Sequence, residues 1–115
     1  MRMIATTLLA AAALSAAAPV FAADAAWSDG EFLRAHRCLG LAESTDLGVV
    51  DATALKAQIK AENRSRSSYV RGRAEAARAA GVQDGHTRSE AMKAKLLAER
   101  DGVCKAYLDA QVAAN

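Results

Sequence analysis

Residues 28–42, SDGEFLRAHRCLGLA, carry the local signals that decide the fold. Ser28 and Glu31 have the spacing of a capping box, in which the serine hydroxyl accepts a hydrogen bond from the amide of the third residue and that residue's carboxylate returns one. After them, apolar side chains recur at three- and four-residue steps, at Phe32, Ala35, Leu39 and Ala42, with Cys38 and Leu41 beside them. The stretch therefore predicts an amphipathic helix that begins after Ser28 and ends near Ala42.

The rest of the chain also favours an all-α fold. After residue 22 it has no proline, is rich in Ala, Leu, Lys, Arg and Glu, and shows no run of β-branched residues alternating with polar ones. We expect a turn over residues 43–48, after which Asp51 can cap a second helix. The sequence predicts a small bundle of three or four amphipathic helices.

Residues 52–80 leave two alternatives open. Either one long helix with a solvated centre runs through them, or the helix breaks near residues 65–68, where short polar side chains interrupt the apolar stripe. Such side chains compete for backbone hydrogen bonds, which favours a break. Gly81 is expected just past the end of this helical segment.

The last helix is predicted from residues 87–90, TRSE, which have the spacing of a second capping box. Gly102 lies inside this helix and predicts a local bend or a close approach of another helix, because glycine costs about 1 kcal/mol relative to alanine there. The apolar residues expected to face the neighbouring helices are Met92, Leu96, Leu97, Val103, Cys104, Tyr107, Leu108 and Val112.

The N-terminus has the three parts of an export signal. Arg2 supplies a positive charge, residues 4–18 form an apolar run, and residues 20–22, VFA, form a small-x-Ala cleavage site. We expect residues 1–22 to be a cleaved signal peptide and residues 23–115 to be a single helical domain in the periplasm or outside the cell. No cysteine lies at the cleavage site, so we expect neither a lipid anchor nor stable membrane insertion.

Export determines how the two cysteines are interpreted. In an oxidising compartment Cys38 and Cys104 favour a disulfide that closes the bundle, rather than two buried free thiols. The chain-entropy model gives a bridge over so long a loop about 4 kcal/mol. A zinc site with His36 and His86 is a further alternative, but the spacing of His36 and Cys38 is not typical of zinc ligands. We therefore predict no metal and no cofactor.

Motifs of catalysis are absent from the sequence. Gly-x-Ser-x-Gly, a phosphate-binding P-loop and His-Glu-x-x-His do not occur, and neither histidine belongs to a catalytic motif. A small helical domain also has little room for a ligand-sized cavity. We predict that the protein is not an enzyme.

Charge is distributed unevenly along the chain. Residues 24–51 carry six acids against two bases, whereas residues 56–78 carry seven bases against two acids. The simpler interpretation is a solvated face, partly compensated by the acidic first helix. The alternative is a basic surface for an anionic partner, with Lys60, Arg64, Arg66, Arg71 and Arg73 as the candidate binding residues. Nucleic acid is not expected to meet an exported protein.

Residues 27–33, WSDGEFL, are similar to the Trp-x-Cys-x-x-Phe-Leu start of the HdeA-type periplasmic acid-stress chaperones. A signal peptide, a short all-helical mature chain and one long-range disulfide also resemble the plan of that family. Asp29 or Gly30 stands where the family has a cysteine. The likeness is one of architecture and assigns no functional residues.

Together these features predict an exported, non-catalytic helical protein that binds another protein. We expect it to be a stress-associated, chaperone-like or inhibitor-like protein. Its partner would be a periplasmic protein. An alternative is a binder of anionic cell-envelope polymer through the basic residues. A small enzyme or metal protein is the third hypothesis.

Overall fold

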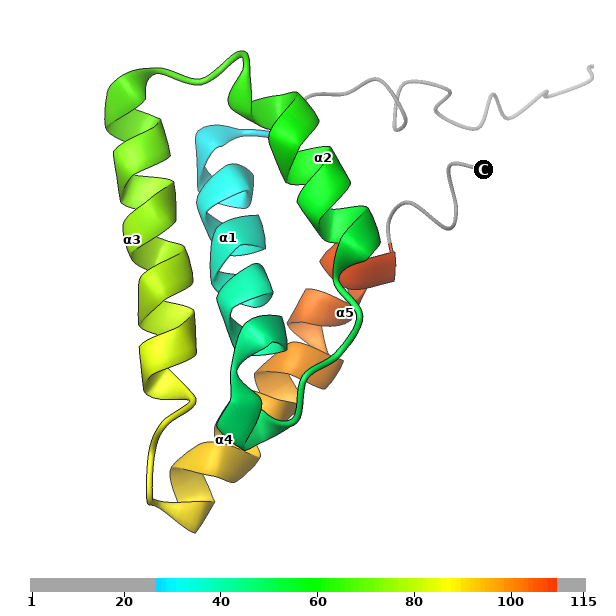
Figure 1. Cartoon of the computed structure of the whole chain (residues 1–115), viewed down its shortest axis with the longest axis vertical. Coiled ribbons are helices and arrows are strands. Elements are labelled where there is room, and N and C mark those ends of the chain that lie inside the picture. Colours follow the sequence, from blue (N-terminus) through cyan, green and yellow to red (C-terminus); the bar gives the residue numbers. More distant parts are fainter. Residues whose placement is uncertain (1–26, 110–115) are drawn as a thin grey trace, which may run out of the picture.

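Five α-helices and one short 3-10 helix make up residues 27–109, the part of the chain that the computed structural model describes (Figure 1). The all-α prediction is confirmed, although the helices number five rather than three or four. The predicted signal peptide and Val112 lie outside the described residues. In chain order the elements are α1 (Asp29–Glu43), η2 (Thr45–Leu47), α2 (Thr53–Asn63), α3 (Ser68–Asp84), α4 (Glu90–Asp101) and α5 (Val103–Asp109).

Helix α1 is the central element, and α2, α3, α4 and α5 all pack against it. It begins where the sequence predicts, because the Ser28 hydroxyl accepts a hydrogen bond from the amide of Glu31 at 3.1 Å. Figure 1 shows α1 between α2 and α3. The whole predicted apolar face is buried, which confirms it as the core of the fold: Phe32, Ala35, Cys38, Leu39, Leu41 and Ala42.

The segment predicted either as one helix or as two is two helices. Helix α2 ends at Asn63 and α3 begins at Ser68. The polar run between them forms local bonds: the Ser65 hydroxyl donates to the carbonyl of Glu62, and the Ser67 hydroxyl accepts from the amide of Val70. These bonds replace helical ones and cap both ends, as expected for short polar side chains.

Gly81 does not end α3, contrary to the sequence prediction. The helix continues to Asp84, and Gly81 is buried against α1. A Cβ atom on Gly81 would lie 2.6 Å from the carbonyl oxygen of Arg37, and one on Gly40 would lie 2.1 Å from that of Arg78. Both glycines are therefore needed for close packing of α1 on α3, while Gly85 is the C-terminal cap.

The last predicted helix differs from expectation at its start, its middle and its exposed face. Ser89 rather than Thr87 caps α4, by accepting from the amide of Met92 at 3.2 Å, because Thr87 bonds to the amide of Ser89 instead. At Gly102 the chain leaves the helical conformation, so α4 and α5 are separate helices. Met92 and Val103, both predicted to be buried, are 44% and 60% exposed.

The Cys38–Cys104 disulfide is present and joins α1 to α5. Both residues are buried, and their Cα atoms lie 5.3 Å apart. The prediction of a bridge is thus confirmed and the alternative of two free thiols is excluded. Helix α5 has only seven residues, too few for a helix to be stable by itself, and the covalent bond ties it to the core.

Within residues 27–109, no helix is both long enough and apolar enough to cross a bilayer.

Candidate functional site

The five candidate binding residues lie at the end of the molecule where α2 meets α3. Lys60 is in the last turns of α2, Arg64 follows that helix, Arg66 is in the turn, and Arg71 and Arg73 are in the first turns of α3. The break between the helices interrupts the basic stripe that one continuous helix would have formed. The structure separates the five into one inward-facing residue and four exposed ones.

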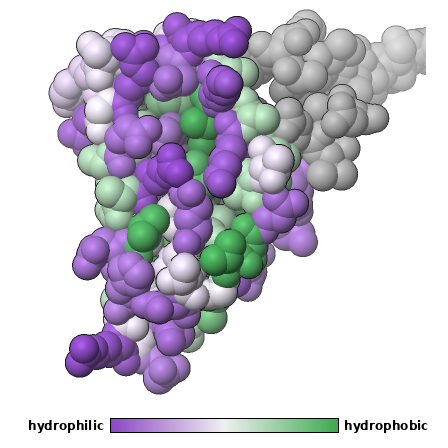
Figure 2. Space-filling model, in the orientation of Figure 1, coloured by the Kyte–Doolittle hydropathy of each residue, from purple (hydrophilic) through white to green (hydrophobic). Residues whose placement is uncertain are grey.

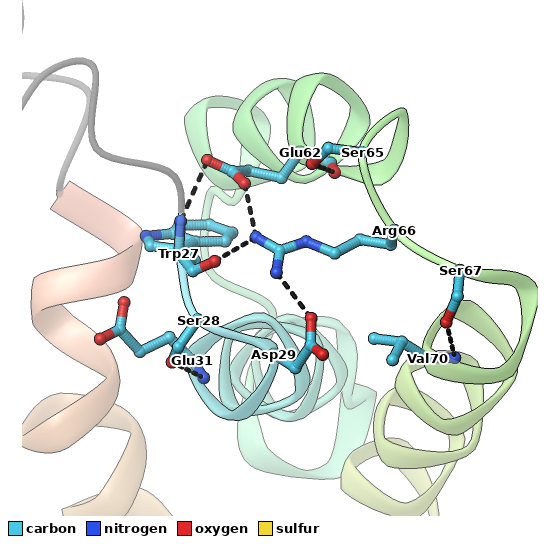
Figure 3. Close-up of polar contacts among 9 residues, drawn as sticks. All are labelled: Trp27, Ser28, Asp29, Glu31, Glu62, Ser65, Arg66, Ser67 and Val70. Carbon is cyan, nitrogen blue, oxygen red and sulfur yellow. Dashed lines mark hydrogen bonds and ion pairs between the residues drawn. The ribbon is translucent and has the colours of Figure 1, made fainter.

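Arg66 is the residue that turns inward, and its side chain is only 7% exposed (Figure 3). Its guanidinium donates to Asp29 Oδ1 at 2.8 Å and to Glu62 Oε2 at 2.7 Å, and it also bonds to the carbonyl of Trp27. The same group lies 4.9 Å from the ring centroid of Phe32. Burial by itself lowers the pKa of Arg66, but the bonds to both carboxylates outweigh it and raise the pKa. Arg66 thus fastens the start of α1 to α2.

The other four cations are exposed: Lys60, Arg64, Arg71 and Arg73. None of these four forms an ion pair with another residue in the range 27–109. One of them, Arg73, lies beside an aromatic side chain that the charge pattern did not single out. Tyr69 is 71% exposed, and the guanidinium of Arg73 lies 6.0 Å from its ring centroid. We call Arg64, Tyr69, Arg71 and Arg73 the basic corner.

The sequence offered one signal for Tyr69. It is an aromatic residue in the first turn of α3. Arginines surround it in the sequence, and it follows the polar run that interrupts the apolar stripe of α2. An aromatic ring outside an apolar stripe is a candidate for the surface, and a tyrosine four residues before an arginine lies beside it on a helix.

The remaining basic residues of the stripe are engaged with α1. Arg78 donates to both carboxylate oxygens of Glu43, at 2.7 and 2.8 Å, and the Lys56 ammonium lies 3.8 Å from Glu43. The hydrogen bond from Arg78 is the main reason that the pKa of Glu43 is lowered, and Lys56 adds to the effect. Arg78 is therefore a link between α3 and α1.

A cleft of about 390 Å³ lies between α2 and α3, over α1. Figure 2 shows hydrophobic surface recessed between hydrophilic side chains at this place. The floor and walls come from three helices: His36 and Leu39 from α1, Lys56, Ile59, Lys60 and Asn63 from α2, and Glu75 and Arg78 from α3.

His36 is the unusual residue of this cleft. It is 2% exposed, and neither ring nitrogen has a hydrogen-bond partner among the described residues. Its ring packs edge-on against Phe32, with centroids 4.7 Å apart. Burial lowers the pKa of His36; Glu75 opposes this effect and Arg78 adds to it. The imidazole is therefore neutral at pH 7, and leaving a buried polar group unpaired costs about 1–3 kcal/mol.

The residues considered as zinc ligands are not brought together as a metal site. Cys38 and Cys104 are bonded to each other, so neither sulfur is a thiolate. His86 lies 2.7 Å from Asp46, on the surface. Over the part of the chain that the structure describes, no three His, Cys, Asp or Glu side chains cluster in a way that could hold a metal ion.

No protein-family model matches the chain, and neither the curated proteins nor the solved structures include a significant match to it. The resemblance to the HdeA-type chaperones stays a likeness of plan. The basic corner and the cleft are thus the two features from which function can be argued.

Proposed function

We propose that this chain is an exported, non-catalytic helical protein that acts by binding an acidic surface of another protein through the basic corner. The observation that carries the proposal is the 71% exposure of Tyr69 beside Arg73. Tyrosine and arginine are the residue types enriched among the few that dominate the free energy of protein association. Arg64 and Arg71 add unpaired positive charge, which attracts and orients an acidic partner.

Three arginines outside the basic corner have a structural role that the arginines of the corner lack. Arg37 donates to Glu99 and Asp84, Arg66 to Asp29 and Glu62, and Arg78 to Glu43, so each links neighbouring helices. The arginines of the basic corner contribute no such link. Their charge is therefore available to a second molecule at little cost to the fold.

The exported location in this proposal is supported by two features. Residues 1–22 have the composition of a signal peptide, and the disulfide between α1 and α5 is of the kind that forms and persists outside the cytosol. The non-catalytic assignment is supported by the absence of catalytic motifs from the sequence.

Photo-crosslinking from position 69 tests the proposal. The full chain, carrying benzoylphenylalanine in place of Tyr69, is expressed in the cells that export it and irradiated. We expect one discrete cross-linked protein, which disappears when Arg64, Arg71 and Arg73 are replaced by glutamine. The control carries the photoreactive residue at Ala106, an exposed position of α5. Equal labelling from positions 69 and 106, or labelling that ignores the three glutamines, would contradict the proposal.

A second candidate is binding of anionic cell-envelope polymer by Lys60, Arg64, Arg66, Arg71 and Arg73. The exposed, unpaired state of four of these residues favours it, whereas Arg66 is held inside by Asp29 and Glu62. Tyr69→Ala separates the two candidates, since removing the ring weakens a protein contact and leaves polymer binding unchanged. Polymer binding must also weaken with added salt, because exposed charges are screened; persistence in high salt would exclude it.

A further inference from the structure

The cleft over α1 has an apolar floor and polar rims. Leu39 and Ile59 are 2% and 8% exposed and form the apolar part. Lys56 and Lys60 line the α2 side one turn apart, and Glu75 and Arg78 line the α3 side. Its volume of about 390 Å³ falls in the range of small-molecule sites, which combine apolar walls with a few convergent polar groups.

The charges around the cleft favour an anion. Arg78 and Glu43 neutralise each other through two hydrogen bonds. Lys56 is 3.8 Å from the same carboxylate, and Lys60 has no ion-pair partner within residues 27–109. Glu75 is the one acidic residue lining the cleft, so the lining keeps an excess of positive charge on the α2 side.

His36 provides a buried polar group that a ligand can satisfy. A neutral imidazole has one N–H donor and one bare nitrogen that accepts, and here neither has a partner among the described residues. His36 lines the cleft, but both ring nitrogens are shielded from solvent in the unliganded protein. A carboxylate that enters the cleft must therefore move the overlying side chains aside before it accepts from the N–H group and turns its second oxygen toward the lysines.

We propose that the cleft between α1, α2 and α3 binds a small organic acid, with its carboxylate between His36 and Lys60 and its apolar body on Leu39 and Ile59. The site is separate from the basic corner, so either can exist without the other. Protein binding through Tyr69 neither requires this site nor follows from it.

Titration with sodium hexanoate, followed by NMR of the intact, disulfide-bonded protein, tests the proposal. We expect saturable shifts at His36, Leu39 and Ile59 in the millimolar range that suits so small a ligand. 1-Hexanol, which has the same chain length without the charge, and acetate, which has the charge without the chain, are expected to bind more weakly. The pKa of His36, measured from its ring signals, is expected to rise when hexanoate is bound, because a nearby anion favours the imidazolium.

Two lysine variants complete the test. Lys60→Gln removes an exposed charge at the cleft and is expected to weaken hexanoate binding about fivefold, as for an exposed ion pair. Lys95→Gln is the matched control, since α4 contributes no residue to the cleft and Lys95 is exposed too. Equal binding of hexanoate and 1-hexanol, equal effects of the two lysine variants, or an unchanged His36 pKa would each overturn the proposal.

Discussion

Gly40 of α1 and Gly81 of α3 face each other where the two helices cross. A Cβ atom on Gly40 would lie 3.1 Å from the Cα atom of Gly81 and 2.1 Å from the carbonyl oxygen of Arg78. The backbones are therefore in direct contact, without side chains between them. This crossing holds the α3 wall of the cleft, with Glu75 and Arg78, close to the floor that α1 supplies.

Alanine at either glycine should destabilise the protein. In Gly40→Ala and Gly81→Ala the added methyl group meets backbone atoms, which cannot move aside as a flexible side chain can. Overpacking of this kind costs about 1–3 kcal/mol. Urea unfolding of each variant, followed by circular dichroism, measures the loss.

Gly72→Ala is the control for these variants. Gly72 is in the same helix as Gly81, and apart from its chain neighbours and the backbone of its own helix no atom lies within 4 Å of the position its Cβ would take. Alanine there is expected to stabilise the protein by up to about 1 kcal/mol, the difference in helix propensity. If Gly81→Ala stabilised the protein as Gly72→Ala does, the close crossing of α1 and α3 would be wrong.

Removing the Cys38–Cys104 bond should lower the free energy of unfolding by about 4 kcal/mol, because the bond closes a long loop in the unfolded chain. The double variant Cys38→Ala with Cys104→Ala avoids leaving a free thiol. Its urea midpoint, compared with that of the oxidised parent, gives the loss. A midpoint that equals the parent's would show that the bridge contributes nothing to the fold.

Arg66→Gln should be more damaging than Arg71→Gln, although the two residues look alike in the sequence. Arg66 is 7% exposed and neutralises Glu62, which is itself 14% exposed, so its removal leaves a mostly buried carboxylate without its cation. We expect a loss of about 1–3 kcal/mol for Arg66→Gln and less than about 0.5 kcal/mol for Arg71→Gln. Thermal unfolding of both variants decides the point. Equal losses would mean that the network in Figure 3 contributes nothing to stability.

Sequence patterns correctly predicted the features that depend on neighbouring residues. The Ser28 cap, the apolar face of α1 and the break before Ser68 each depend on residues within one or two helical turns. The disulfide also followed from the sequence, because only Cys38 and Cys104 were there to pair.

The misassigned features depend on contacts between distant segments. Glycine is the residue type typical of a helix end, but Gly81 instead allows α3 to pack closely on α1 at Gly40, which lies far away in the sequence. Arg66 differs from Arg64 because its side chain bonds to Trp27 and Asp29, which lie far away in the sequence. The cleft could not be predicted either, since three helices must be placed before His36 lies at its floor.

His36 should make the protein less stable in mild acid. Its pKa in the folded state lies below the 6.5 of an unperturbed histidine, chiefly through burial. The unfolded chain therefore binds a proton more readily than the folded one. As the pH falls through about 6.5, the free energy of unfolding therefore decreases, and it levels off once the pH is below the folded-state pKa.

His36→Gln isolates this contribution, because glutamine keeps a donor and an acceptor but does not titrate. We expect the parent to lose more stability than the variant between pH 7 and pH 5, measured by urea unfolding across that range. Glu75 and Arg78 face His36 from α3 and remain in both proteins, so their effects cancel in the comparison. If the free energies of unfolding of the parent and of His36→Gln changed equally with pH, the fold would not be holding His36 neutral. The inference that its imidazole is buried and unpaired at the floor of the cleft would then be wrong.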